Sequence, residues 1–522
     1  MSSTKLVENV PRADITHPKP TTIQNGIDVS ANVRSWKSYL WDTFDKSPAE
    51  RRLLFKIDAT LVTFGCLGTF IKFLDRANLN TAFVSGMKED LHLYGNQLNY
   101  ANTSYSIASI IALVPVNLLL TRTNPRYFIP FLEIGWTVCT FGQSRMNTPA
   151  QLYALRALLA IFETGHYSAI MFLCGSWYQK GELARRMAIV NMAAQAGPMF
   201  SAYLQAAAYS GLNGVHGLAG WRWLFLIDGI ISLGIIIPQL FLLPEVPSRL
   251  KPNFMFSAEE IELARDRQPK EGRVRQGAFS RAQVLRWFTT PEIWILWLIA
   301  ASQNIGYLPN QSMAFWFKAW NKIKPKSYTV QQINNYTTPI YATTITITTL
   351  MAWASDTVFK GRRWPMLILG GAVNFVVCIL LATTPVFPAN RAFRWFLYYQ
   401  TGWGEASNCM FWAWTNEILS GDPATRAFAG AGLQVWSQVF AATIPLAVFQ
   451  TVDQPRVKAG NFTAAGFWIV QIICASALAY MLKYKNGKGT QLLQNVPGEG
   501  SENESNEDFQ GKSGAQPHVI PV

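Results

Sequence analysis

Long apolar segments recur along almost the whole chain. Of the 522 residues, 50% are hydrophobic and only 15% are charged, which is too little charge for a set of water-soluble domains of this size. A helix that crosses the hydrocarbon core of a bilayer needs roughly 20 mostly apolar residues. Because about twelve such runs follow one another, the sequence predicts an all-α membrane protein with twelve spanning helices.

The predicted spans fall into two sets of six around a charged central segment. We expect a disordered tail over residues 1–52, a six-helix bundle over 53–243, a loop over 244–290, a second six-helix bundle over 291–485 and a second disordered tail over 486–522. The expected spans are residues 57–80, 97–121, 127–144, 149–177, 188–210 and 221–243 in the first bundle, and 291–316, 332–354, 364–384, 392–418, 427–450 and 462–483 in the second.

Positive charge is distributed unevenly among the connecting segments. The chain has 45 Lys and Arg residues against 31 Asp and Glu, and most of the basic residues lie in alternate loops. Since cytoplasmic loops of membrane proteins are enriched in Lys and Arg, we expect both termini in the cytoplasm. The same alternation argues against a nucleic-acid partner. In the central loop, Ser257 followed by acidic residues predicts a short amphipathic helix.

Several chemical functions are disfavoured by the motifs of the chain. The six cysteines lie in apolar segments and form no CxxC pair, which argues against a disulfide framework or a zinc site. The sequence has no GxxxxGK[ST] phosphate-binding loop, no HExxH and no GxSxG nucleophile elbow. We therefore expect neither an ATP-driven pump nor an enzyme, and no cofactor or metal.

Charged residues inside the apolar segments are the main indication of function. Lys72, Asp75 and Arg76 lie within the first span, and Arg156 and Glu163 lie within the fourth. A charge in the hydrocarbon core costs about 2.5–3.5 kcal/mol on insertion scales, so these side chains should face partners or a watery path. At about 1.5 Å per residue, Asp75 and Arg156 reach the same depth, which predicts an ion pair between them.

The same charges suggest recognition of a carboxylate coupled to movement of a proton. Glu163 follows Arg156 by two helical turns and lies near the midplane, where a carboxylate without a close cation tends to take up a proton. Arg76 offers a planar fork that suits a carboxylate. The alternative is that these charges pair structurally and hold two helices together. Lys72 either lines the path or extends its ammonium group to the interface.

Uncharged polar residues in later spans are further candidates for the same cavity. The seventh span carries a polar stripe with Gln303, Asn304 and Tyr307, followed by Pro309, which predicts a kink. Polar groups that face lipid need partners, so this stripe is expected to face the cavity. In the tenth span, Glu405 and Asn408 lie one turn apart amid glycines. Either they line the second half of the cavity, or Glu405 contacts backbone that is shielded from lipid.

Three other intramembrane residues allow more than one interpretation. His166, just after Glu163, either shuttles protons and touches the substrate or is a structural histidine. Asp228, in the sixth span, is expected to fix helix packing. Glu133, in the third span, has no assigned partner.

Two local motifs resemble those of the anion:cation symporter family of the major facilitator superfamily. The first is Phe-Leu-Asp-Arg-Ala-Asn-Leu-Asn at residues 73–80. The second combines Arg156 and the Glu-Thr-Gly at residues 163–165 with the Ser-Trp-Tyr at 176–178. The basic loop from Asp356 to Arg363 resembles a signature of the superfamily. Residues 84–91 and 212–223 are similar to fungal vitamin carriers, above all to the pantothenate–proton symporter branch, alongside allantoate, nicotinate and biotin relatives.

This resemblance implies a function and a role for each motif residue. It implies uptake of a small organic anion, a monocarboxylate such as pantothenate, driven by the proton gradient of the plasma membrane. Arg76 would bind the substrate carboxylate, with Asn78 of the same motif as a further substrate contact. Asp75 and Glu163 would handle the proton, and Arg156 would pair with Asp75. The expected partners are the substrate, the proton and the lipid bilayer, and the expected state is a monomer.

Two alternatives to uptake stay open at this point. The first is an exporter or intracellular carrier of another carboxylate, such as nicotinate, biotin, allantoate or a secondary-metabolite acid, because the direction of transport is not encoded in these motifs. The second is a nutrient sensor that binds without transporting. Sensors of this fold tend to have long cytoplasmic extensions, and the predicted tails are short.

Overall fold

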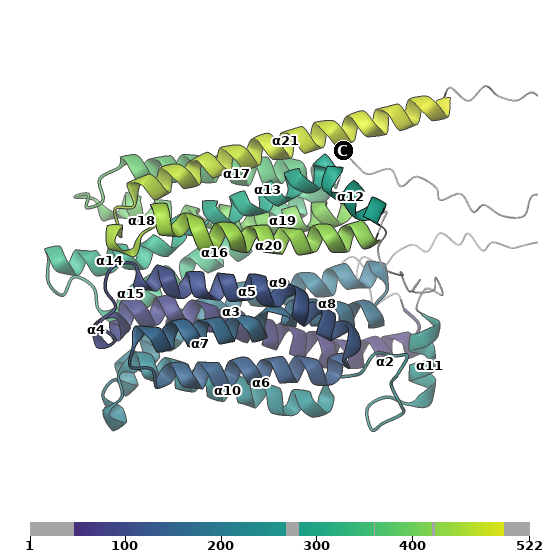
Figure 1. Ribbon diagram of the computed structural model, residues 1–522, viewed down its shortest axis with the longest axis horizontal. Helices are drawn as coiled ribbons and strands as arrows, with labels where there is room; N and C mark the ends of the chain where they lie inside the picture. The colour runs from purple at the N-terminus through teal and green to yellow at the C-terminus, as the bar shows by residue number, and fades with distance from the viewer. Residues whose placement is uncertain (1–45, 268–280, 360, 420–422, 495–522) are drawn as a thin grey trace, which may run out of the picture. The chain divides into compact units, whose positions relative to one another are not determined.

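The computed structural model describes residues 46–267, 281–359, 361–419 and 423–494, and every secondary-structure element in these ranges is a helix (Figure 1). Seven helical segments in the described ranges are long and apolar enough to cross a membrane. These segments are Pro48–Asp90, Gln97–Leu120, Pro149–Trp177, Gly220–Leu242, Trp364–Thr383, Phe428–Val448 and Lys458–Tyr484. The structure is therefore that of an all-helical, multi-pass membrane protein, whereas the count of twelve spans and the cytoplasmic termini stay predictions.

The helices before the central segment form the first set. They are α2 (Pro48–Ile57), η2 (Asp58–Val62), α3 (Thr63–Ala82), η3 (Phe83–Met87), α4 (Lys88–Asp90), α5 (Gln97–Arg122), α6 (Pro125–Ser144), α7 (Pro149–Thr164), α8 (His166–Trp177), α9 (Lys180–Leu212), η4 (Val215–Gly217) and α10 (Gly220–Leu242). Within this set α3 packs against α9 and α10, α6 against α7 and α10, and α5 against α7.

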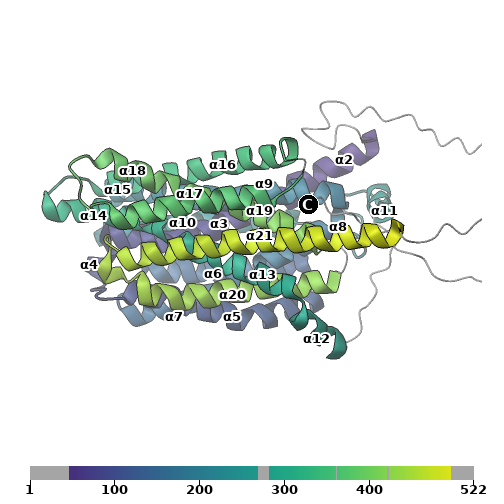
Figure 2. The ribbon, with the colours of Figure 1, turned by 90° about the horizontal axis from the view of Figure 1, so that it is seen from above.

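The central segment and the second set follow. The central helices are α11 (Ala258–Asp266) and α12 (Arg281–Thr289). The second set is α13 (Pro291–Gly306), η5 (Leu308–Gln311), α14 (Ser312–Ile323), α15 (Val330–Thr337), α16 (Pro339–Thr357), α17 (Trp364–Thr383), α18 (Arg391–Gln400), α19 (Gly402–Ile418), α20 (Pro423–Val448), η6 (Thr451–Asp453) and α21 (Lys458–Gln494). Here α17 packs against α19 and α21, which lie side by side with it in both views (Figures 1 and 2), and α13 packs against α20 and α21.

Contacts between the two sets gather at the end where α5 begins. The α5 helix packs against α20, and α9 packs against α15 and α16. The amide of Asn99 donates hydrogen bonds to the backbone oxygens of Pro445 (3.1 Å) and Phe449 (2.9 Å). Asn334 donates to Ser85 Oγ at 3.0 Å. These polar contacts add to apolar packing between the sets, in which the ring centroids of Phe83 and Phe315 lie 5.8 Å apart.

Several predicted spans are interrupted where the sequence carries small or kinking residues. The fourth divides into α7 and α8 at Gly165, where a Cβ atom would lie 2.2 Å from the side chain of Val116 on α5. The seventh is broken by η5, which contains Pro309, and this confirms the predicted kink. The predicted central helix is also confirmed, because the Ser257 side chain accepts from the Glu260 N–H at the start of α11.

The boundaries of the tails differ from the prediction. The chain is already helical from Pro48, inside the predicted tail 1–52, because proline suits the first turn and the residues after it are good helix formers. At the other end α21 continues to Gln494, past the predicted limit at 485. The remaining parts of the predicted tails, 1–45 and 495–522, lie outside the described residues.

Candidate substrate and proton site

Helix α3 carries three charged residues inside an apolar segment. Asp75 is only 1% exposed, whereas Lys72 and Arg76 are half-buried. The ammonium group of Lys72 donates a 3.0 Å hydrogen bond to the backbone oxygen of Glu163, at the end of α7. Lys72 therefore joins α3 to α7 inside the protein, and its role in a substrate path stays a prediction.

Tyr105 on α5 is the centre of this group. Its hydroxyl donates a 2.6 Å hydrogen bond to Oε2 of Glu163. The guanidinium carbon of Arg156 lies 4.9 Å from the centre of the Tyr105 ring, and that of Arg76 lies 5.4 Å from it. Cations at this distance are attracted by the aromatic ring. One side chain therefore connects both arginines with the carboxylate that was predicted to carry a proton.

The Arg156–Glu163 region contains buried polar atoms without protein partners. Arg156 and Glu163 are 1% and 0% exposed. Among the described residues, Nε and Nη1 of Arg156 and Oε1 of Glu163 have no hydrogen-bond partner. Because buried polar groups are normally hydrogen-bonded, unpaired donors on a buried guanidinium indicate a place where an anion can bind.

The predicted ion pair between Asp75 and Arg156 is not formed. Asp75 Oδ1 instead accepts a 2.8 Å hydrogen bond from the hydroxyl of Thr140 on α6, and Arg156 acts on Asp75 only through longer-range electrostatics. The depth estimate placed the two residues at the same level but could not say which sides of α3 and α7 they occupy. Arg156 lies on the side of Tyr105, and Asp75 on the side of α6 and α10.

Asp228 on α10 is the main partner of Asp75, and sequence reasoning had assigned it to helix packing. The side chains of Asp75 and Asp228 lie within hydrogen-bonding distance of each other. Asn78 donates to Asp228 Oδ2, and its own carbonyl oxygen accepts from Ser201 at 2.6 Å. Asn78 is thus engaged by protein groups at both amide atoms, and its role in substrate binding stays a prediction.

The second set contributes a smaller group opposite Arg76. Glu405 accepts a 3.1 Å hydrogen bond from Gln195 of α9, and it also contacts the side chain of Asn408. Both Glu405 and Tyr307 lie within electrostatic range of Arg76. These half-buried residues come from α19 and the end of α13, so the structure brings Glu405, Asn408 and Tyr307 together with the α3 cluster.

Two other predicted residues of the second set bond within that set. Gln303 Nε2 lies 3.4 Å from Ser407 Oγ, and Asn304 Nδ2 lies 3.4 Å from the backbone oxygen of Ser437. Gln303 is buried and Asn304 half-buried. Both hydrogen bonds are long, so their amides are held weakly and their substrate role stays a prediction.

His166 finds its partner outside this cluster. Its Nε2 lies 3.0 Å from Oε1 of Glu133 on α6, the residue for which the sequence offered no partner. The assignment of His166 to proton coupling stays a prediction.

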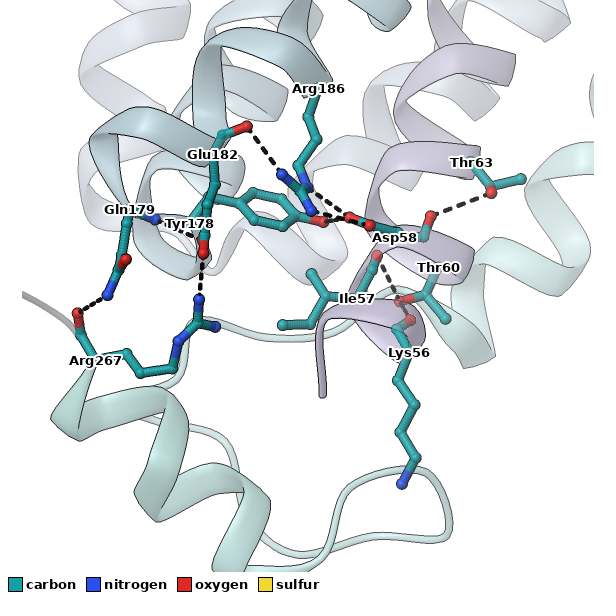
Figure 3. Close-up of polar contacts among 10 residues, drawn as sticks. All are labelled: Lys56, Ile57, Asp58, Thr60, Thr63, Tyr178, Gln179, Glu182, Arg186 and Arg267. Atoms are coloured by element: carbon teal, nitrogen blue, oxygen red, sulfur yellow. Dashed lines mark hydrogen bonds and ion pairs between the residues drawn. The ribbon is translucent and has the colours of Figure 1, made fainter. Parts of the chain in front are cut away.

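A second buried polar cluster lies around the start of α3 (Figure 3). Arg186 donates to both oxygens of Asp58, at 2.7 and 3.1 Å, and Tyr178 donates to Asp58 Oδ1 at 2.6 Å. Arg267, just after α11, donates to Glu182 at 2.6 Å. This cluster joins η2, α8, α9 and the central segment, and its charges are satisfied by one another.

The chain is similar to known proteins over most of its length. The model of the Major Facilitator Superfamily matches residues 65–445. A pantothenate transporter of Saccharomyces cerevisiae is 31% identical over 446 residues, which are 82% of this chain and 84% of that protein. A vitamin H transporter of the same yeast is 32% identical over 438 residues, or 82% of this chain and 72% of that protein. A pantothenate transporter of Schizosaccharomyces pombe is 30% identical over 412 residues, 79% of this chain and 78% of that protein.

Solved structures share the fold at low sequence identity. The crystal structure of a D-xylose–proton symporter superposes with a TM-score of 0.59 at 15% identity, covering 81% of this chain and 97% of that one. A mutant of the nucleoside transporter NupG superposes with a TM-score of 0.56 at 12% identity, covering 81% and 99%. At these identities the likeness concerns the fold alone.

Proposed function

Since this chain belongs to the Major Facilitator Superfamily, we propose that it is a proton-coupled secondary transporter that imports a small organic carboxylate by alternating access. The chain is a membrane transporter and not an enzyme. Pantothenate or a related vitamin is the proposed substrate, supported by fungal relatives that are named pantothenate and vitamin H transporters.

The observation that carries the proposal is the shared position of Tyr105 between Glu163 and the two arginines. Arg76 is half-buried, so its guanidinium fork is accessible to a substrate carboxylate. Arg156 lies on the same ring with buried donors that lack a protein partner. A carboxylate bound between these arginines would therefore lie close to Glu163.

Coupling follows from the charges in this confined region. A bound substrate anion and an ionised Glu163 repel each other where water is scarce, so the substrate favours the protonated form of Glu163. By linkage, protonation of Glu163 favours substrate binding to the same extent. The contact between Asp75 and Asp228 offers a second place for a proton, because two buried carboxyl groups in contact are more stable when they share one.

Alternating access is supported by the arrangement of the two helical sets. One group of polar contacts between the sets lies at the end where α5 begins, where Asn99 bonds to α20 and Asn334 bonds to Ser85. We propose that these contacts break when that end opens. The proposed arrangement has bundles over 53–243 and 291–485 with cytoplasmic termini, in a monomer in the plasma membrane.

A radiolabelled uptake panel tests the proposal. Pantothenate, biotin, nicotinate and allantoate are supplied separately to a transport-deficient host that expresses the chain, with and without a protonophore. The proposal expects saturable uptake of one of these acids that the protonophore abolishes. Uptake that is indifferent to the protonophore would refute proton coupling, and loss of preloaded acid instead of uptake would assign export.

A further inference from the structure

A second pair of titratable side chains lies inside the first helical set, apart from the arginines. His166 and Glu133 are 0% and 1% exposed, and their facing atoms lie 3.0 Å apart. Their other polar atoms, His166 Nδ1 and Glu133 Oε2, are also buried and have no hydrogen-bond partner within the described ranges. A pair that served packing alone would be expected to have these atoms satisfied.

The helices around the pair leave space for its two side chains. A Cβ atom at Gly68 of α3 would lie 2.6 Å from both Glu133 Oε1 and His166 Nε2. Position 68 therefore needs glycine for the pair to reach the α3 backbone. On another side, the ring of Trp136 meets the imidazole edge to face, with the centroids 5.1 Å apart. The pair is thus held in one place by α3 and α6.

The pair lies about two helical turns from Asp75, which in turn contacts Asp228. Asp75 follows Gly68 by two turns on the same face of α3, and Thr140, its hydrogen-bond partner, follows Glu133 by two turns on α6. The separation along these helices is about 10 Å.

A small cavity lies beside the pair. Gly68, Glu133 and Trp136 line it, together with Ser232 and two isoleucines of α10. The Ser232 hydroxyl donates to the backbone oxygen of Asp228 at 2.9 Å, so one residue that lines the cavity lies one helical turn from Asp228. Its size corresponds to about one water molecule.

The electrostatic surroundings of the pair are set by few charges. Within two helical turns of the residues that line the pair or the cavity lie Lys72, Asp75 and Arg76 on α3, Arg126 on α6, Glu163 on α7 and Asp228 on α10. The other packed helices, α5 and α9, carry their charged residues only near one end, at Arg122 and at Lys180, Glu182, Arg185 and Arg186. A proton on the pair is therefore influenced by the proposed substrate-binding and coupling residues together with Arg126.

We propose that Glu133 and His166 form a proton-relay pair, which exchanges a proton with Asp75 and Asp228 along the cavity and conducts it through the first helical set on a route separate from that of the substrate. The loaded pair is an imidazolium with a carboxylate, and the unloaded pair is a neutral imidazole with a carboxylate. The inference rests on the proton coupling of the proposed function, but not on the identity of the carboxylate.

Proteoliposomes containing the full chain test the relay. Glu133→Gln and His166→Gln are compared with the unaltered protein for two readouts, which are accumulation driven by an imposed pH gradient and exchange without a gradient. The probe is the acid taken up in the panel above. We expect gradient-driven accumulation to fall by about tenfold or more, with exchange kept and the pH profile of accumulation altered.

Two further variants separate a relay from packing. Glu133→Asp retains a carboxyl group and is expected to recover part of the accumulation. Thr137→Val, one turn away on α6, removes a hydroxyl that bonds only to the Glu133 backbone oxygen and is expected to leave accumulation unchanged.

The outcomes are distinguishable. If the unaltered protein shows no gradient-driven accumulation, the proposed function fails. If it accumulates and both glutamine variants accumulate equally with the same pH profile, only the relay is overturned. Loss of exchange in Glu133→Gln, His166→Gln and Glu133→Asp alike would also overturn it, since the pair would then be structural.

Discussion

The hydroxyl of Tyr105 donates a 2.6 Å hydrogen bond to Oε2 of Glu163, while the ring of the same tyrosine lies against the guanidinium groups of Arg76 and Arg156. This relationship places the proposed proton carrier at the hydroxyl, and the arginines proposed to bind the substrate beside the ring, of one rigid side chain. A change in charge at Glu163 therefore changes the electrostatic potential where the substrate carboxylate is proposed to bind.

Removal of the Tyr105 hydroxyl tests this connection. Tyr105→Phe keeps the ring beside the arginines but deletes the hydrogen bond to Glu163, and a hydrogen bond to a charged group is worth about 1.5–3 kcal/mol. We expect proton-driven uptake to fall about tenfold or more. Initial uptake rates measure the effect, and Tyr100→Phe, on the same helix with a 49% exposed side chain, is the matched control. Equal losses in both variants would argue against the connection.

Arg76 is expected to need its guanidinium fork rather than its charge alone. Arg76→Lys retains the charge but replaces two parallel donors by a single ammonium group. We expect a KM at least about tenfold higher for the carboxylate, whereas the exposed Arg145→Lys should match the unaltered protein. Concentration-dependent uptake measures KM, and an unchanged value for Arg76→Lys would remove Arg76 from the site.

Asp228 is expected to contribute to proton coupling through Asp75. Asp228→Asn keeps the size and most hydrogen bonds of the side chain but removes a carboxyl group that can share a proton. We expect a smaller accumulation ratio with a changed pH profile and with substrate exchange retained. Ile230→Ala, on the exposed face of α10, is the control. An accumulation ratio equal to that of the unaltered protein at every pH would assign Asp228 to packing.

The central helix α11 gives a prediction about pH and stability. Burial alone would raise the pKa of Glu260, but hydrogen bonds from Lys56 and from the backbone N–H of Ser257 outweigh burial and hold the pKa below the ordinary range. A lowered pKa in the folded state means that the contact stabilises the fold above the ordinary glutamate pKa of about 4.3 and is lost as the pH falls through the lower value.

Hydrogen exchange over residues 255–266 measures this effect. We expect the protection factors of these amides, which compare observed with intrinsic exchange rates, to fall as the pH is lowered into that range. At neutral pH, Glu260→Gln should accelerate it and the exposed Glu259→Gln should not. The same exchange in both variants would show that the Lys56 contact does not hold the helix.

Most of the fold could be predicted from the sequence because the bilayer imposes a simple rule on it. Apolar runs of sufficient length become helices, and Ser257 and Pro309 mark a helix start and a break through local chemistry that does not depend on the rest of the chain. The tail boundaries were wrong because helix formation at Pro48 and after residue 485 follows from propensity, which an apolar pattern does not report.

The charged residues of the site could be predicted from the sequence, but the residues that contact them could not. Lys72, Asp75, Arg76, Arg156 and Glu163 are visible because charges in apolar runs are rare. The sequence did not indicate Tyr105 as a residue of the site, since a tyrosine in a spanning helix more often packs against other helices or lies at a membrane interface.

The partner of Asp75 was missed for a geometric reason. Residue spacing gives the depth of a side chain along its helix, but the direction it faces depends on how neighbouring helices are rotated. That rotation brings Thr140 and Asp228 to Asp75 and leaves Arg156 beside Tyr105.

The most direct test of the central claim is transport by Glu163→Gln in proteoliposomes, measured both as accumulation under an imposed pH gradient and as exchange of labelled for unlabelled substrate. Glutamine keeps the size of the side chain and can still accept from Tyr105, but it cannot take up and release a proton. We expect accumulation to be abolished while exchange continues. Accumulation against a gradient by Glu163→Gln, at the level of the unaltered protein, would contradict it.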